Sequence, residues 1–139
     1  MKLLTIYGSS RKNGNSEVLT KKVLEQLDPE HVHEIHLLDY HVEPIIDKRH
    51  SEDGFQPVQD NYEEIAHLLM NHEAILFATP LYWYGMSGQM KNVFDRFTQS
   101  LRSTEYDFKT VMKEKKSILS LLVEPRLLSP LSHSFSNSN

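Results

Sequence analysis

The sequence predicts one α/β domain, a three-layer α/β/α sandwich with a parallel sheet between two layers of helices. Short apolar segments alternate along the chain with segments whose apolar residues follow helical spacing. The central apolar segment, residues 74–78, contains no polar residue, as is typical of a strand buried on both faces of a parallel sheet. Alternating strands and helices need crossover connections, which are right-handed and place helices on both faces.

The first part of the chain contains two predicted strands and one predicted helix. Residues 3–7 are apolar and precede a glycine, which predicts a short buried strand. A helix is expected from residue 16 to near residue 28, because three apolar residues lie four positions apart: Leu19, Val23 and Leu27. A second strand is expected within residues 32–38, and residues 41–59 are expected to form a long irregular connection.

The second part of the chain continues the alternation. Apolar residues at helical spacing predict a helix over residues 62–69, and the strand at 74–78 follows it. The strongest helical pattern occupies residues 86–101, and a charged stretch at 109–116 leads to a fourth strand at 118–123. The predicted parallel sheet has four strands in the order 2-1-3-4, although doubly wound sheets of this type often have five.

The last segment has a different composition. Residues 124–139 are rich in serine, contain two prolines and show no sustained period. Such a segment is expected to be irregular or disordered, so the predicted domain covers residues 1–123.

The composition excludes several functional classes. The chain has 139 residues, a formal charge of −4 and no cysteine, which excludes disulfides, thiolate nucleophiles and cysteine-ligated clusters. This charge gives no broad basic surface, so no nucleic-acid partner is expected. No apolar run approaches the roughly 20 residues that span a bilayer, so no membrane partner is expected and a cytoplasmic location is predicted.

A loop of small and polar residues joins the first predicted strand to the first helix. Such a loop offers backbone N–H groups and the positive end of a helix dipole to a phosphate. Gly8 allows a sharp turn, Gly14 permits a close approach or a positive φ, and Arg11 adds a charge. Glu17 is expected to favour the helix dipole and to point away from the phosphate. The alternative is a serine-rich turn that only caps the helix.

An aromatic loop, residues 79–86, follows the central strand. In an open α/β sheet, ligands bind beyond the carboxyl ends of the strands, where the strand order reverses. The first and third strands flank that point, and the two loops follow these two strands. A phosphate and a flat conjugated ring at one edge suggest flavin mononucleotide (FMN). The alternative is that the aromatic residues belong to the core or to an interface.

The two loops resemble the NAD(P)H-dependent FMN reductase family of flavodoxin-like proteins, close to its YwqN type, over residues 1–116. The resemblance lies in Gly8-Ser9-Ser10-Arg11-x-x-Gly14-Asn15-Ser16, in the segment Pro80-Leu81-Tyr82-Trp83-Tyr84-Gly85-Met86-Ser87-Gly88-Gln89-Met90-Lys91, and in Asp95-Arg96. It implies that four residues bind the FMN phosphate: Ser9, Arg11, Asn15 and Ser16. It also implies that five residues bind the isoalloxazine: Pro80, Tyr82, Trp83, Tyr84 and Gly85.

The resemblance implies an FMN-dependent oxidoreductase that uses NAD(P)H as co-substrate and passes electrons to a quinone-like or other small acceptor. Helix 86–101 has enough apolar residues for an interface as well as a core, so a homodimer or higher homo-oligomer is expected. The chain departs from the family after its fourth strand, where no glycine-rich turn, fifth strand or last helix follows. The alternative functions are a non-enzymatic electron carrier and a flavin-free remnant that lacks the C-terminal part of the fold.

Other candidate sites are weak. Five histidines lie close together in the sequence: His31, His33, His36, His41 and His50. Their spacing is not one that brings metal ligands together, so no metal site is predicted. No serine, histidine and acid lie in a nucleophile context, so no dedicated catalytic residue is predicted. A flavin carries the hard chemistry itself and needs none.

Overall fold

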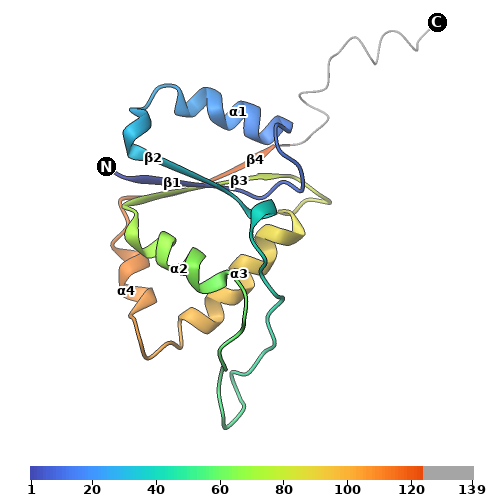
Figure 1. Ribbon diagram of the computed structural model, residues 1–139, viewed down its shortest axis with the longest axis vertical. Helices are drawn as coiled ribbons and strands as arrows, with labels where there is room; N and C mark the ends of the chain where they lie inside the picture. The colour runs from blue at the N-terminus through green and yellow to red at the C-terminus, as the bar shows by residue number, and fades with distance from the viewer. Residues whose placement is uncertain (124–139) are drawn as a thin grey trace, which may run out of the picture.

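The computed structural model describes residues 1–123 and contains a parallel sheet of four strands in the order β2-β1-β3-β4 (Figure 1). The strands are β1 (Leu3–Tyr7), β2 (Val32–His36), β3 (Ala74–Pro80) and β4 (Ser117–Val123). Strands β1 and β3 are buried along their whole length, as expected for the centre of the sheet. The predicted strand order is confirmed. The tail expected at 124–139 lies outside the described residues.

Helices cover both faces of this sheet (Figure 1). Helix α1 (Asn15–Leu24) packs on one face, and α2 (Tyr62–Asn71), α3 (Gly88–Ser100) and α4 (Phe108–Lys113) lie on the other. Two short 3-10 helices, η1 (Pro29–His31) and η2 (Leu37–Asp39), precede and follow β2. No helix of the described residues has the length and apolar character that a membrane span requires.

The larger core lies between the sheet and helices α2 and α3. Leu4 and Ile6 of β1 and Phe77 of β3 are buried there against residues such as Ile65 and Val93. The smaller core, under α1, consists of four buried residues: Leu3, Leu24, Ala74 and Leu76. The sheet is therefore asymmetric, with its thickest apolar layer on the side of α2 and α3.

Helix α1 buries a different face from the one that its apolar pattern suggests. Val23 and Leu27, which mark the predicted helix, are exposed, and the helix ends at Leu24. Its buried face instead carries Ser16, Glu17 and Thr20, whose hydroxyl donates to the carbonyl oxygen of Ser16 at 2.6 Å. Hydrogen bonds satisfy the Glu17 carboxylate and the Thr20 hydroxyl, so the helix can bury these two groups against the sheet.

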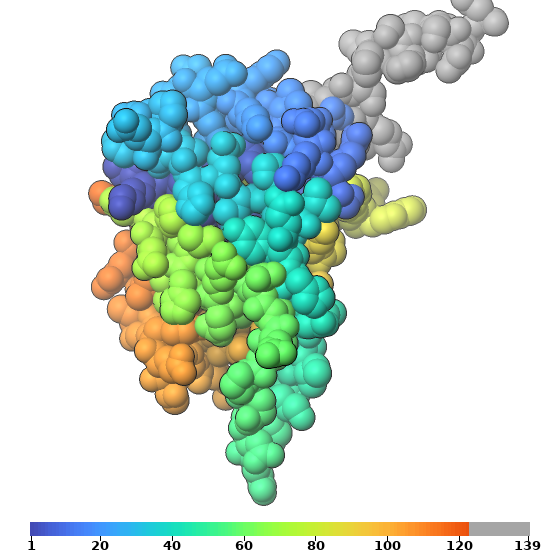
Figure 2. Space-filling view, viewed as in Figure 1, coloured from blue at the N-terminus to red at the C-terminus, as the bar shows by residue number. Residues whose placement is uncertain are grey.

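The long connection between η2 and α2 is irregular, as predicted, and protrudes from the body in teal and green (Figure 2). Arg96 of α3 fixes its base. The guanidinium, which is 2% exposed, donates to Asp60 at 2.6 Å and to the carbonyl oxygen of Glu43 at 3.0 Å. It also lies 4.6 Å from the centre of the Tyr62 ring. One buried cation thus joins the connection to two helices.

Strand β4 forms one edge of the sheet and is incompletely covered. Ile118, Leu119 and Leu122 are 46%, 56% and 51% exposed, respectively. In the parallel register, Leu119 lies beside Leu76 and Ile118 beside Ile75, which pack on opposite faces. Apolar surface is therefore exposed on both sides of this strand.

Candidate functional site

The two loops singled out in the sequence meet at the carboxyl edge of β1 and β3 (Figure 1). Gly8 directly follows β1, and its N–H donates to the carbonyl oxygen of Ala78 at 2.8 Å. A Cβ atom on Gly8 would lie 2.9 Å from Ser87 Oγ and 3.0 Å from Met90 Cε. Only glycine permits this approach, so the start of the first loop packs directly against the start of α3.

The first loop, residues 8–14, brings together polar groups suited to an anion. Ser9 is buried, and its Oγ accepts the N–H of Arg11 at 3.2 Å. The position of a Cβ on Gly14 is 3.6 Å from both Ser9 Oγ and Arg11 Nε. Among residues 1–123, no carboxylate forms an ion pair with the Arg11 guanidinium. Its charge is therefore available to a bound anion.

Helix α1 begins directly after this loop. Gly14 is its N-cap residue and provides no side-chain hydrogen bond. The first backbone N–H groups of a helix have no partner within the helix, and they add to the positive end of its dipole. Asn15 and the buried Ser16 occupy the first two helical positions. The predicted phosphate residues thus lie in one short stretch of chain around this helix end.

The backbone conformation of the loop differs from the simplest expectation for its glycine. Gly14 has φ −74°, whereas Asn13 adopts the left-handed region at φ 61°. Asparagine tolerates that region better than most residues other than glycine. A Cβ on Gly14 would meet Ser9 and Arg11 at 3.6 Å, an ordinary contact distance, so packing among the described residues does not require glycine here. The close approach of Gly14 to a phosphate stays a prediction.

Glu17 has a role that the sequence pattern did not suggest. Its side chain is buried in the first turn of α1, and Oε2 accepts the N–H of Asn13 at 2.6 Å. Oε1 accepts from His36 Nε2 at 2.9 Å and from Lys21 Nζ at 3.1 Å. Burial acts to raise the pKa of Glu17, but these three hydrogen bonds outweigh it and hold the pKa below its ordinary value. The carboxylate is therefore charged at neutral pH.

The second loop contains a tight turn. Tyr82 and Gly85 exchange two backbone hydrogen bonds of 2.8 and 2.9 Å. Between them, Trp83 and Tyr84 have φ values of 47° and 65°, and each side chain is 96% exposed. Turns with two left-handed residues favour asparagine and glycine, so two aromatic residues here store backbone strain. Figure 2 shows this segment protruding in yellow-green beside the body.

The second loop ends at the capped start of α3. Thr79 Oγ1 accepts the N–H of Ser87 at 3.0 Å, and Ser87 Oγ accepts the N–H of Met90 at 3.2 Å. The Oε1 atom of Gln89 is buried and has no hydrogen-bond partner among the described residues. A buried oxygen of this kind is a ready acceptor for a ligand N–H group. Spacing alone did not single out Gln89.

The structure brings together some of the predicted residues and separates others. Ser9, Arg11, Asn15 and Ser16 belong to one continuous loop and helix start. Pro80 is buried at the end of β3. The side chains of the tight turn converge on no described group: Tyr82 is 44% exposed, and Trp83 and Tyr84 are almost fully exposed.

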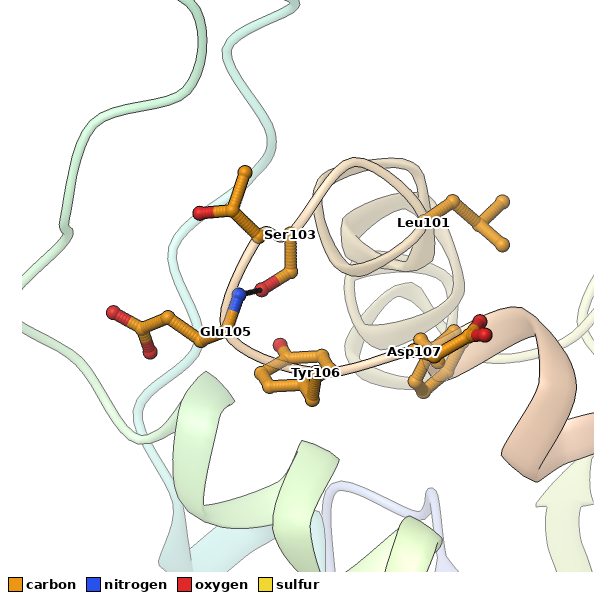
Figure 3. Close-up of a pocket in the computed structure, with 7 residues that line it drawn as sticks. Leu101, Ser103, Glu105, Tyr106 and Asp107 are labelled. Carbon is orange, nitrogen blue, oxygen red and sulfur yellow. Dashed lines mark hydrogen bonds between the residues drawn. The ribbon is translucent and has the colours of Figure 1, made fainter.

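Some hollows on the described surface lie away from the two loops. One, of about 420 Å³, is lined by Leu101, Tyr106, Asp107 and neighbouring residues at the C-terminal end of α3 (Figure 3). Because the 13 residues of α3 span about 20 Å, this hollow is far from the two loops. Near the amino ends of the strands, away from the two loops, His33 Nδ1 lies 3.3 Å from His72 Nε2. No group of three potential metal ligands converges within residues 1–123.

Comparisons with known proteins place these features in a family. The family model described as NADPH-dependent FMN reductase matches residues 1–115. A protein of Bacillus subtilis named YwqN, provisionally assigned as an NAD(P)H-dependent FMN-containing oxidoreductase, is 42% identical over 118 residues. An iron-sulfur flavoprotein of Methanocaldococcus jannaschii is 31% identical over 99 residues. These matches cover 84% and 69% of this chain, but only 64% and 51% of the respective relatives.

Solved structures agree on the fold. A Bacillus subtilis structure named Trp repressor binding protein is 32% identical with a TM-score of 0.64, over 97% of this chain and 76% of that chain. An NAD(P)H:quinone oxidoreductase from Methanothermobacter marburgensis has a TM-score of 0.63 over 99% of this chain and 91% of its own, at 13% identity. At that identity the likeness concerns the fold alone. The predicted flavodoxin-like fold class is confirmed, and the chain belongs to the NADPH-dependent FMN reductase family.

Proposed function

We propose that this chain binds FMN at the carboxyl edge of β1 and β3 and acts as an NAD(P)H-dependent oxidoreductase. The observation that carries the proposal is the contact of Gly8 with Ser87 and Met90, which makes the two loops neighbours. A phosphate at the first loop and a ring at the second would then lie within reach of one bound molecule. Membership of the FMN reductase family supports the same ligand.

The donor set of the first loop fits a phosphate. Arg11 supplies a charge without a competing carboxylate among the described residues, and the start of α1 supplies backbone N–H groups. Ser9 Oγ and the hydroxyl of Ser16 add further polar groups. In the proposal these residues, together with Asn15, hold the phosphate of FMN.

The second loop fits a flat ring with polar edges. Trp83 and Tyr84 present aromatic surface that no described residue covers, and Gln89 Oε1 is a buried acceptor without a partner. In the proposal, the isoalloxazine is held by Pro80, Tyr82, Trp83, Tyr84 and Gly85, with Gln89 as an added acceptor. Exposed aromatic residues bind such rings through their apolar faces and edges.

FMN, when bound, supplies the acceptance of hydride from NAD(P)H and the delivery of electrons to an acceptor. The residues of the chain would bind the phosphate and orient the ring. The proposed acceptor is a quinone-like or other small molecule. The name of the relative YwqN supports the choice of NAD(P)H and FMN.

The proposal includes the setting in which the chain acts. We propose a cytoplasmic location, which the absence of cysteine supports. A homodimer also remains a proposal, but helix α3 gives it less support than its sequence pattern suggested. Met90 and Val93 are buried in the chain's own core, and Phe94 and Phe97 pack against that core. Leu101, just after the helix, is 57% exposed.

A second candidate function is electron transfer by bound FMN without a reaction with NAD(P)H. A related alternative is that the chain binds no flavin. The observation that favours these alternatives is the exposure of three apolar residues on the edge strand β4: Ile118, Leu119 and Leu122. Within residues 1–123, this edge of the sheet is incompletely covered.

One experiment separates these functions. The purified chain is loaded with FMN, freed of excess ligand and mixed with NADH or NADPH under anaerobic conditions. The oxidoreductase proposal predicts loss of the visible flavin absorbance and its return when a quinone is added. An electron carrier would keep its FMN but stay oxidised with both nucleotides. A folded chain that retains no FMN would overturn the proposal.

A further inference from the structure

We infer that Glu17 is a positioning residue for the phosphate-binding loop, and that it acts through the backbone of Asn13. This inference rests on the proposed function and assigns a role to a residue outside the predicted binding set. Glu17 touches no proposed FMN group itself. It would act by fixing the conformation of the loop that does.

The two carboxylate oxygens of Glu17 make different contacts. Oε1 is fixed from two sides, by His36 Nε2 of β2 at 2.9 Å and by Lys21 Nζ at 3.1 Å. His36 is itself held by stacking on the Tyr7 ring, with ring centroids 4.7 Å apart. These contacts leave Oε2 directed at the loop, where it accepts the N–H of Asn13 at 2.6 Å.

This contact fixes the residue whose conformation is least favourable in the loop. Asn13 has φ 61°, a region in which a non-glycine residue needs support from its surroundings. The hydrogen bond from the Asn13 N–H to Oε2 of the buried Glu17 side chain supplies that support. Because Asn13 immediately precedes Gly14 and the start of α1, its conformation sets how residues 9–11 face the helix end.

The charge of Glu17 would by itself repel a phosphate. Lys21 and the hydrogen bond from His36 face its Oε1 atom, whereas the phosphate loop retains the separate charge of Arg11. The side chain of Glu17 therefore acts through its length, which places an acceptor oxygen at the N–H of Asn13. A shorter side chain should lose the effect, and a neutral side chain of equal length should keep it.

The test compares FMN with riboflavin, which carries the same ring without the phosphate. The ratio of the two dissociation constants measures what the phosphate loop contributes. Glu17→Asp keeps the charge but withdraws the carboxylate by about 1.5 Å, the length of one carbon–carbon bond. Glu17→Gln keeps both the length and an acceptor oxygen. Glu25, an exposed carboxylate at the end of the same helix, provides matched controls as Glu25→Asp and Glu25→Gln.

We expect Glu17→Asp to lower the preference for FMN over riboflavin by about tenfold, the effect of losing one hydrogen bond. The affinity for riboflavin should stay unchanged, which a general loss of folding would not allow. Glu17→Gln should keep the preference within about threefold of the unchanged chain, and both Glu25 variants should keep it fully.

The outcomes separate the inference from the function on which it rests. If the unchanged chain prefers FMN and Glu17→Asp, with a normal melting curve, keeps that preference, the role of Glu17 is overturned alone. Equal loss of preference in Glu17→Gln would also overturn it, since reach would then not be the property that matters. If the unchanged chain binds FMN no better than riboflavin, the phosphate loop itself is wrongly assigned.

Discussion

Arg11 is the residue on which the phosphate assignment depends most directly, because its guanidinium has no carboxylate partner among the described residues. Arg11→Ala should weaken FMN binding by about 1–3 kcal/mol through loss of a charge-assisted contact. Fluorescence titration of FMN measures the effect. Lys12→Ala is the matched control, since Lys12 is adjacent in sequence and pairs with Asp39 at 3.0 Å. Equal effects of the two variants would contradict the assignment.

The strained aromatic turn gives a second prediction at the scale of single residues. Replacing Trp83 by asparagine and Tyr84 by glycine installs the residues that a turn with two left-handed positions prefers. We expect the free energy of unfolding to rise by about 1–2 kcal/mol, because backbone strain is relieved and no buried contact is lost. Denaturant unfolding measures this gain.

The same double variant should bind FMN more weakly, because it removes both exposed rings. A gain in stability together with weaker FMN binding would show that the strained turn is retained because it binds FMN. Unchanged FMN affinity would contradict the role proposed for Trp83 and Tyr84 at the ring.

The sequence selected candidate residues for the site but not their conformations. Loop composition and the position of each loop after its strand were enough to select Ser9, Arg11 and the aromatic turn. The left-handed backbone at Asn13 was not predictable, since a neighbouring glycine was the more natural place for it. The role of Glu17 depends on His36, which only folding brings within 2.9 Å.

Among the elements, α3 carries the interaction with the largest expected effect on stability. Arg96 and Asp60 form an ion pair at 2.6 Å whose side chains are 2% and 1% exposed. Arg96→Ala leaves a buried carboxylate uncompensated and should lower the free energy of unfolding by about 3–5 kcal/mol. The connection over residues 41–61 should then become sensitive to limited proteolysis, because Arg96 also holds the carbonyl of Glu43.

The control for this variant is Lys91→Ala on the same helix. Lys91 pairs with Asp95 at an exposed position, so its loss should cost no more than about 0.5 kcal/mol. If the two variants lose similar free energies of unfolding, the buried Arg96–Asp60 pair contributes no more to stability than the exposed Lys91–Asp95 pair.

The same ion pair predicts how stability depends on pH. Burial acts to raise the pKa of Asp60, but hydrogen bonds from Arg96 and from two backbone N–H groups outweigh it, and the pKa lies below its ordinary value of 3.8. The unfolded state therefore binds a proton at higher pH than the folded state does. The contribution of Asp60 is complete above about pH 4 and is lost as the pH falls through the lowered value. Acid unfolding of Asp60→Asn should lack this component.

For helices, the sequence predicts the position of an element better than the face that it buries. Helical spacing placed α3 well, and Ser87 explains why the helix begins at Gly88 rather than near residue 86. In α1 the spacing of Val23 and Leu27 found the helix but not its buried face, which carries three polar residues beside Leu24. Periodicity records apolar residues and takes no account of hydrogen bonds that allow polar ones to be buried.

For the whole molecule, the layers follow from the alternation of elements, and both the layers and the strand order agree with prediction (Figure 1). The exposed edge at β4 has a consequence for solution behaviour. An uncharged edge strand with exposed apolar residues favours pairing with another chain. Leu119→Lys should reduce self-association in sedimentation velocity while changing the free energy of unfolding by less than about 0.5 kcal/mol.

The control for the edge is Ile46→Lys. Ile46 is 73% exposed but lies in the irregular connection rather than on a strand. It should leave self-association unchanged. If Leu119→Lys associates as strongly as the unchanged chain, β4 is not the surface through which copies meet.

The most direct test of the whole account is a titration of the purified, folded chain with FMN, followed by calorimetry and by visible absorbance. The account predicts one FMN bound per chain, with a melting temperature that rises as free FMN exceeds its dissociation constant. A chain that unfolds cooperatively but shows neither bound FMN nor any rise in melting temperature would contradict it.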